Sequence, residues 1–200
     1  MEKFQNKYCI PSARANWHDY NGGVYFVTIC TKNREHYFGD ITHCRDGVHI
    51  CTDVARNVST EPQMHLSPIG QYAYNQFINV KTHYPYAKIP LFVIMPDHIH
   101  AIVTIDGDCR DGVHTVSTGN RWKSDIVDNQ MQTIAKCKGM LSVVVGGLKR
   151  AITHYANENN IPFAWQTRFH DRIIRNQNEF DRISNYIEKN VVNWHDDLSS

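Results

Sequence analysis

The chain has 200 residues, 42% of them hydrophobic, and a formal net charge of +1 at pH 7. This size suits a single domain over residues 1–200 with one sizeable core, and no hydrophobic run is long enough to cross a bilayer. The six cysteines form no CxxC pair and no apolar leader follows Met1, so we expect a cytoplasmic protein with reduced thiols and no membrane partner.

The first elements along the chain are a strand and a helix. The apolar run Val24–Thr31 predicts the strand, and the polar turn Lys32–Arg34 follows it. The charges of this turn face either a phosphate group or solvent, and the sequence leaves both open. Ser67 and Pro68 predict the start of the helix, because serine is a good N-cap and proline suits the first turn. The break at Tyr84-Pro85 ends it, and we expect this helix to be structural.

Two histidines occupy the next apolar stretch, Leu91–Ile105. A bend at Met95–Asp97 predicts a strand pair whose second strand begins at His98 and His100. Residues two apart in a strand project to the same side, so both imidazoles share a face. Neutral imidazole is a common ligand of divalent metals. The pair therefore predicts half of a metal site, and the alternative is a half-buried surface pair.

A basic segment follows at residues 136–175. The spacing predicts a helix over Ser142–Asn159, in which the Gly146-Gly147 pair indicates close approach of another backbone. Seven basic residues stand against only two acidic ones, and aromatic residues interleave with them, as in proteins that bind single-stranded nucleic acid. The alternatives are solvated charges and core aromatics. The candidate contacts with nucleic acid are Lys149, Arg150, Trp165, Arg168, Arg172 and Arg175.

The last predicted element is a helix over Asn178–Trp194. Tyr186 and Asn190 lie one turn apart on it, so a phenol and a carboxamide point towards the same place. A tyrosine nucleophile beside a neutral oxygen ligand suits phosphoryl transfer at a metal. The alternative for Tyr186 is a ring packed half in the core. Tyr155 is a rival nucleophile, because Asn159 stands four residues further on, although at the helix end.

Several of these segments together resemble one family. The run Met95–Val103, with the sequence MPDHIHAIV, and the later Tyr186-Ile187-x-x-Asn190 resemble the IS200-like tyrosine transposases, and most closely their REP-associated branch. The matches extend to residues 25–31, 146–149, 165–166 and 169–175, so they are spread over most of the chain. One departure is Val191, since that branch usually has proline after the asparagine.

The resemblance implies a single-tyrosine nuclease of the HUH type. Mg2+ or Mn2+ would be held by His98, His100 and Asn190, the last of which is usually glutamine in insertion-sequence members. Tyr186 would attack single-stranded or hairpin DNA and form a 5′-phosphotyrosine bond. Alternatives are a catalytically retired DNA-binding protein and a metal-dependent hydrolase of small phosphoesters. The family includes dimers with shared active sites, so a homodimer stays open.

The resemblance also implies the fold. The family has an α+β fold with a ferredoxin-like antiparallel sheet, and we expect helices packed on one face of it. The histidines would lie on an inner strand and the tyrosine on a late helix. Strands separated by helical segments in this sequence agree with an α+β layer arrangement.

An internal repeat has no place in this scheme. The sequence CRDGVH occurs at residues 44–49 and again at 109–114. Asp-Gly pairs suit turns, so we interpret both copies as loop insertions, at residues 41–63 and 107–130. The alternative is a zinc site, because thiolate and imidazole are the usual zinc ligands. Its ligands would come from Cys44, His49, Cys51, Cys109 and His114.

Overall fold

The computed structural model describes residues 3–4, 7–8, 20, 22–42, 62–106 and 127–194. Residues 43–61 and 107–126 lie outside the described residues, and with them both copies of the repeat and all five residues of the alternative zinc site. The structure describes only the ends of the two predicted insertions, at residues 41–42, 62–63 and 127–130, and most of these residues belong to strands or a helix. Residues 41–42 end one strand, residue 63 begins another, and residues 127–130 begin a helix.

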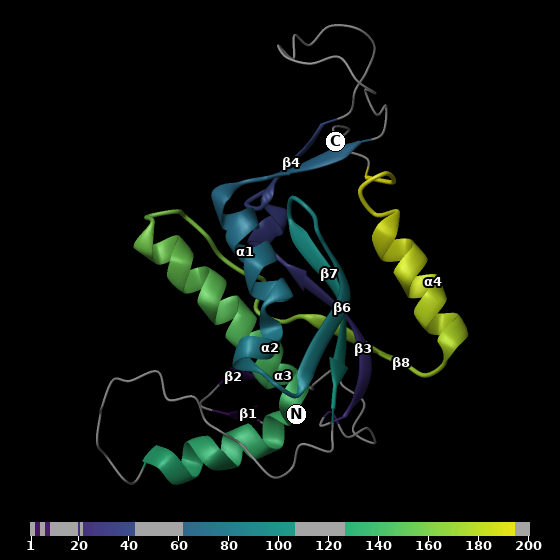
Figure 1. Ribbon diagram of the computed structural model, residues 1–200. Coiled ribbons are helices and arrows are strands. Elements are labelled where there is room, and N and C mark those ends of the chain that lie inside the picture. The colour runs from purple at the N-terminus through teal and green to yellow at the C-terminus, as the bar shows by residue number, and fades with distance from the viewer. Residues whose placement is uncertain are drawn as a thin grey trace, which may run out of the picture.

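A four-stranded antiparallel sheet forms the centre of the molecule (Figure 1). Its strand order is β6-β7-β3-β8. The strands are β3 (Gly23–Cys30), β6 (Ala87–Ile94), β7 (His98–Ile105) and β8 (His170–Ile174). The predicted first strand and the predicted strand pair are therefore confirmed. The bend between β6 and β7 is closed by a hydrogen bond of 2.8 Å from the Met95 N–H to the His98 carbonyl.

In the described residues, four α-helices accompany the sheet: α1 (Pro68–Ile78), α2 (Val80–His83), α3 (Val127–Glu158) and α4 (Gln177–Glu188). The predicted N-cap of α1 is confirmed, because the Ser67 hydroxyl accepts a hydrogen bond of 3.1 Å from the Gly70 N–H. The predicted helix over Ser142–Asn159 corresponds to the second part of α3. This helix bends at Gly139, where φ is +67° and a Cβ would lie 2.8 Å from Cβ of Tyr20. None of the described helices has the length and hydropathy to cross a membrane.

The surroundings of the Gly146-Gly147 pair in α3 differ from the prediction. A Cβ on Gly147 would overlap the side-chain hydroxyl of Tyr84, not a backbone. Around Gly146, no described atom outside its chain neighbours and the adjacent helix backbone lies within 4 Å of the position that a Cβ would take. The close approach is therefore that of an aromatic side chain, and it concerns only one glycine of the pair.

The order of elements around the sheet is β3, α1 with α2, β6, β7, α3 and β8. This strand–helix–strand–strand–helix–strand sequence, with the first strand beside the third and the last, is the ferredoxin-like arrangement. The predicted α+β fold is confirmed. Outside the main sheet lie a 3-10 turn and two small strand pairs, namely η1 (Lys32–Arg34), β4 (Gly39–Thr42) with β5 (Gln63–Leu66), and β1 (Lys3–Phe4) with β2 (Lys7–Tyr8).

Helices cover both faces of the sheet, which corrects the expectation of one covered face (Figure 1). On one face, α1 and α3 pack on the large core that includes Val27 and Ile99. On the other, Ile183 and Ile187 of α4 pack on Ile102 of β7. Successive residues of β7 alternate between the faces, and both kinds are apolar, so each face needs a cover. The site therefore forms between the sheet and α4.

Candidate metal and nucleophile site

His98 and His100 lie on the face of β7 that α4 covers. Both are buried, with 5% and 6% of their surface exposed. Their Nε2 atoms are 3.0 Å apart. The shared face follows from strand alternation, as predicted, and β7 is an inner strand of the sheet. Two ring nitrogens thus converge at the start of a rigid strand.

Each ring is oriented by a partner at its other nitrogen. Nδ1 of His98 donates to Oδ1 of Asp97 at 2.5 Å, and the second oxygen of that carboxylate is 2.7 Å from Nε of Arg34. Nδ1 of His100 is 2.9 Å from Oγ1 of Thr28, its neighbour across the β3–β7 pair. Contacts of this kind typically fix the ring orientation and the tautomer of metal-binding histidines.

The donor set fits a divalent cation. In the neutral form of His98, whose Nδ1 donates to the carboxylate, Nε2 carries a lone pair, and the same holds for His100 when Thr28 accepts from it. Two lone pairs then face each other across 3.0 Å, an arrangement that a shared cation stabilises. Two ligands at right angles and about 2.1 Å from an octahedral metal ion are themselves about 3.0 Å apart.

The electrostatics keep this pair suited to a cation. Burial, together with the neighbouring His98 and Arg34, lowers the pKa of His100 to about 3, so its ring is neutral at physiological pH. Burial of Asp97 favours its neutral form. The hydrogen bond and charge effect of His98 and the charge of Arg34 outweigh burial and hold the pKa of this carboxyl below its usual range. A neutral imidazole beside an ionised carboxylate is the state that binds metals.

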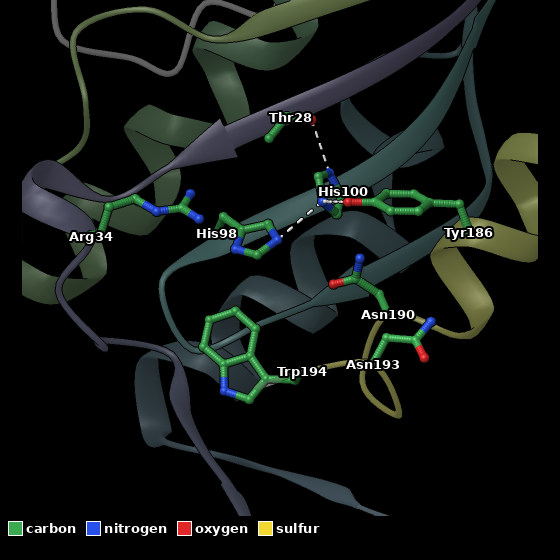
Figure 2. A pocket seen from close by; sticks show the side chains of 8 residues that line it. All are labelled: Thr28, Arg34, His98, His100, Tyr186, Asn190, Asn193 and Trp194. Atoms are coloured by element: carbon green, nitrogen blue, oxygen red, sulfur yellow. Dashed lines mark hydrogen bonds between the residues drawn. The ribbon is translucent and has the colours of Figure 1, made fainter. Parts of the chain in front are cut away.

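Tyr186 brings its hydroxyl to the histidine pair. It lies in the last turn of α4, its Oη is 3.3 Å from Nε2 of His100, and its ring meets Phe26 edge-on. Half of the side chain, 51%, is exposed. Ile183 and Ile187 are the residues of α4 that fill the core. Figure 2 shows the phenol of Tyr186 directed at His100 from the α4 side.

Asn190 reaches the same place from a turn. The predicted helix over Asn178–Trp194 is too long, because α4 ends at Glu188 and residues 189–193 form turns. The Asn190 N–H donates to the Ile187 carbonyl at 3.2 Å, a three-residue return that tightens the chain after the helix. Figure 2 shows its carboxamide directed into the cavity.

A cavity of about 440 Å³ joins these groups. Its lining consists of Thr28, Arg34, His98, His100, Tyr186, Asn190, Asn193 and Trp194. In the part of the chain that the structure describes, no three His, Cys, Asp or Glu side chains gather in a metal-binding group. A third protein ligand would therefore be a neutral oxygen, and Asn190 is a residue that can supply one.

The six residues predicted to contact nucleic acid do not line this cavity. Lys149 and Trp165 are half-buried and bind the backbone, since Nζ of Lys149 donates to the Gln166 carbonyl at 2.8 Å and Nε1 of Trp165 to the Lys149 carbonyl at 3.2 Å. Burial also lowers the pKa of Lys149. The Trp165 ring packs on Phe38 with 5.5 Å between ring centroids. These contacts fix the segment that pairs with the end of β3.

The four arginines of that set are exposed. Arg172 lies on β8 opposite Phe26, on the site face, and is 2.7 Å from Oε1 of Glu179 in α4. The backbone N–H of Arg175 donates to the same carboxylate at 3.2 Å. These two contacts attach the start of α4 to β8. Arg150 lies on α3 and Arg168 on the segment before β8.

The rival nucleophile lies elsewhere. The Tyr155 ring stacks on Tyr72 of α1, with 4.2 Å between centroids and 10° between planes. Sequence reasoning missed Thr28, Asp97, Asn193 and Trp194 and left Arg34 open. Asp97 carried a signal, because a carboxylate directly before a metal-binding histidine is well placed to bind its ring. The others come from segments that only the folded chain brings together.

Comparison with known proteins finds similar proteins whose matches cover most of this chain. No protein-family model matches. An uncharacterized protein of Haemophilus influenzae is 29% identical over 192 residues, which are 93% of this chain and 90% of that protein. The solved structure of a REP-associated tyrosine transposase bound to a REP hairpin is also similar, with 20% identity and a TM-score of 0.47. That match covers 90% of this chain and 72% of the other.

Proposed function

We propose that the protein is a transposase of the IS200-like, REP-associated type, which cleaves and rejoins single-stranded DNA through Tyr186. The observation that carries the proposal is the convergence of three groups in one open cavity. Nε2 of His98 lies 3.0 Å from Nε2 of His100, and that atom lies 3.3 Å from Oη of Tyr186. A pair of histidines that can hold a metal ion and a phenol nucleophile are the parts that this reaction needs.

The chemistry divides among the residues of the cavity. Oη of Tyr186 attacks the phosphorus, the bond from phosphorus to the 3′ oxygen breaks, and the leaving strand keeps a 3′-hydroxyl. The phenolic proton is lost and the departing oxygen gains one, so the exchange balances. Mg2+ or Mn2+ held by His98, His100 and Asn190 would polarise the phosphate and offset the charge that develops on it.

The phosphotyrosine bond conserves the energy of the broken linkage. A second 3′-hydroxyl can attack it, which releases Tyr186 and joins two strands. The exposed position of Tyr186 supports this role, because a nucleophile that is bonded to a DNA strand has to be reached from solvent. Hairpin DNA is the proposed substrate, in keeping with the REP hairpin bound by the similar transposase.

The test is covalent capture of DNA. The protein is incubated with labelled hairpin DNA from beside its own gene, with Mn2+ or with EDTA, and run on a denaturing gel. We expect a protein–DNA band with Mn2+ that Tyr186→Phe abolishes. Tyr155→Phe is the matched control and retains the band, because Tyr155 stacks on Tyr72 outside the cavity. DNA binding without any band would replace this proposal with a retired, DNA-binding relative.

A further inference from the structure

Arg34 differs from the other residues of the cavity in charge and in backbone conformation. Among the eight described lining residues, it is the one with a fixed charge. Its φ is +58°, and that of Asn33 before it is +56°. Residues other than glycine are uncommon in this left-handed region, and they persist where the surrounding structure holds them, often at functional sites. The turn η1 is thus held in a shape that places Arg34 at the cavity.

One edge of the Arg34 guanidinium is fixed by the protein. Its Nε lies 2.7 Å from Oδ2 of Asp97, and its Nη1 donates to Sγ of Cys30 at 3.1 Å. A guanidinium has five N–H donors, and these two contacts with described residues use two of them. The side chain is 55% exposed, whereas that of Asp97 is 4% exposed. Figure 2 shows the guanidinium reaching from η1 towards His98.

This arrangement suits a phosphate group. The planar guanidinium binds phosphate oxygens through two parallel N–H donors, and it is the preferred side chain for that purpose. Asp97 holds the fork in place but is itself shared with His98, so its charge is divided between two partners. Arg34 lines the same cavity as Tyr186.

We propose that Arg34 binds a non-bridging oxygen of the DNA phosphate that enters this cavity. Asp97 holds one edge of the guanidinium, and the exposed edge receives the phosphate. The inference rests on the proposed function for its ligand, single-stranded DNA, but not on cleavage. It adds a cationic phosphate contact to a lining in which no other described residue carries a fixed charge.

The salt dependence of DNA binding tests this contact. Each phosphate contact in a single-stranded complex contributes about 0.7 to the slope of log affinity against log salt concentration. The slope is measured by fluorescence anisotropy with labelled single-stranded DNA and Mn2+, in a Tyr186→Phe background that prevents covalent capture. We expect Arg34→Gln to weaken binding and to reduce the slope by about 0.7. Arg34→Lys keeps the charge and most of the slope.

Arg182→Gln is the matched control. Arg182 has a side chain of similar exposure, 65%, and a carboxylate partner in Glu179 at 3.9 Å, but it lies outside the cavity. The Arg182→Gln substitution removes the same charge as Arg34→Gln, and we expect it to leave the salt dependence of DNA binding unchanged. An Arg34→Gln slope equal to that of the parent overturns the inference, as does a parent that binds no single-stranded DNA.

The two proposals fail in different ways. A tyrosine–DNA band together with an unchanged Arg34→Gln slope contradicts only the phosphate contact. A reduced slope without any band supports the phosphate contact and contradicts cleavage by Tyr186.

Discussion

The ring of His98 is oriented by the carboxylate that precedes it in the chain. Asp97 is 3% exposed and accepts from Nδ1 of His98, while Arg34 binds its other oxygen. The carboxylate thereby makes Nε2 of the ring a more basic electron-pair donor to a metal, and it stops the ring from rotating. The metal affinity of the site should therefore depend on a residue that touches no metal.

Replacing Asp97 by asparagine tests this dependence. An asparagine side chain carries no charge, so the His98 ring loses both its strong acceptor and its fixed tautomer. We expect Mn2+ to bind about 10–100-fold more weakly, as measured by isothermal titration calorimetry. Asp181→Asn is the control, since Asp181 is an exposed residue of α4 that accepts from Gln177. Equal affinities of Asp97→Asn and the parent would show that Asp97 does not support the site.

Asn190 and Asn193 both line the cavity, but their side chains differ in direction. Figure 2 shows the carboxamide of Asn190 directed towards the histidine pair and that of Asn193 directed away from it. We expect Asn190→Ala to weaken Mn2+ binding and to slow formation of the tyrosine–DNA band about tenfold or more, which corresponds to about 1.4 kcal/mol. Asn193→Ala should change both quantities much less. The opposite order would move the ligand role to Asn193.

The residues of the site were predictable only in part. The spacing of His98 and His100 places both on one strand face without any knowledge of the fold. Tyr186 lies 86 residues from His100, and no periodicity relates the two. Its role was inferred from a motif, and the role stays a prediction. Thr28 and Arg34 reach the site because β3 pairs with β7, and such pairing depends on contacts between distant segments.

At the scale of elements, α4 is attached to β8 at its start and carries Tyr186 in its last turn. The Asn176 side chain accepts from the Glu179 N–H at 2.9 Å, which caps the helix, and Glu179 binds Arg172 of β8. The buried Ile183 and Ile187 fix its rotation. The start of this helix was predicted to within one residue, at Asn178 instead of Gln177, but its N-cap Asn176 was not identified from the sequence. Its end was predicted too late, because the structure ends the helix at Glu188 and residues 189–193 form turns.

The glycine pair of α3 gives a matched test of packing. A methyl group at Gly147 would overlap the Tyr84 hydroxyl, and one at Gly146 would meet no described atom. We expect Gly147→Ala to lower the free energy of unfolding by about 1–3 kcal/mol, as overpacking does. Gly146→Ala should raise it by up to about 1 kcal/mol, because alanine favours the helix. Urea unfolding followed by circular dichroism measures both. Equal effects would contradict the packing against Tyr84.

At the scale of the whole molecule, the strand pattern predicted an α+β fold but not the position of every helix. Ile102 of β7 is fully buried on the face opposite Ile99. A strand that is apolar on both faces reveals that two layers cover it, and not which helices do so. The place of α4 follows from its pairing with Arg172 and Ile102, which only the folded chain shows.

Metal binding should stabilise the whole fold. A ligand that binds only the folded state raises the free energy of unfolding by about 2.7 kcal/mol at a concentration 100 times its Kd. We therefore expect Mn2+ to raise the melting temperature in thermal unfolding, and His98→Ala to abolish the shift. His65→Ala is the control, because His65 lies on β5 and binds Thr42. An equal shift in His98→Ala would place the bound metal elsewhere.

The linear order of the site along the chain has a consequence for synthesis. The ribosome makes the turn with Arg34 first, then β7 with both histidines, and only much later α4 with Tyr186 and Asn190. Under the proposed function, a nascent chain that stops before Gln177 has both histidines but lacks Tyr186 and Asn190. Unfinished chains would then be unable to form the tyrosine–DNA bond, because the proposed nucleophile is made last.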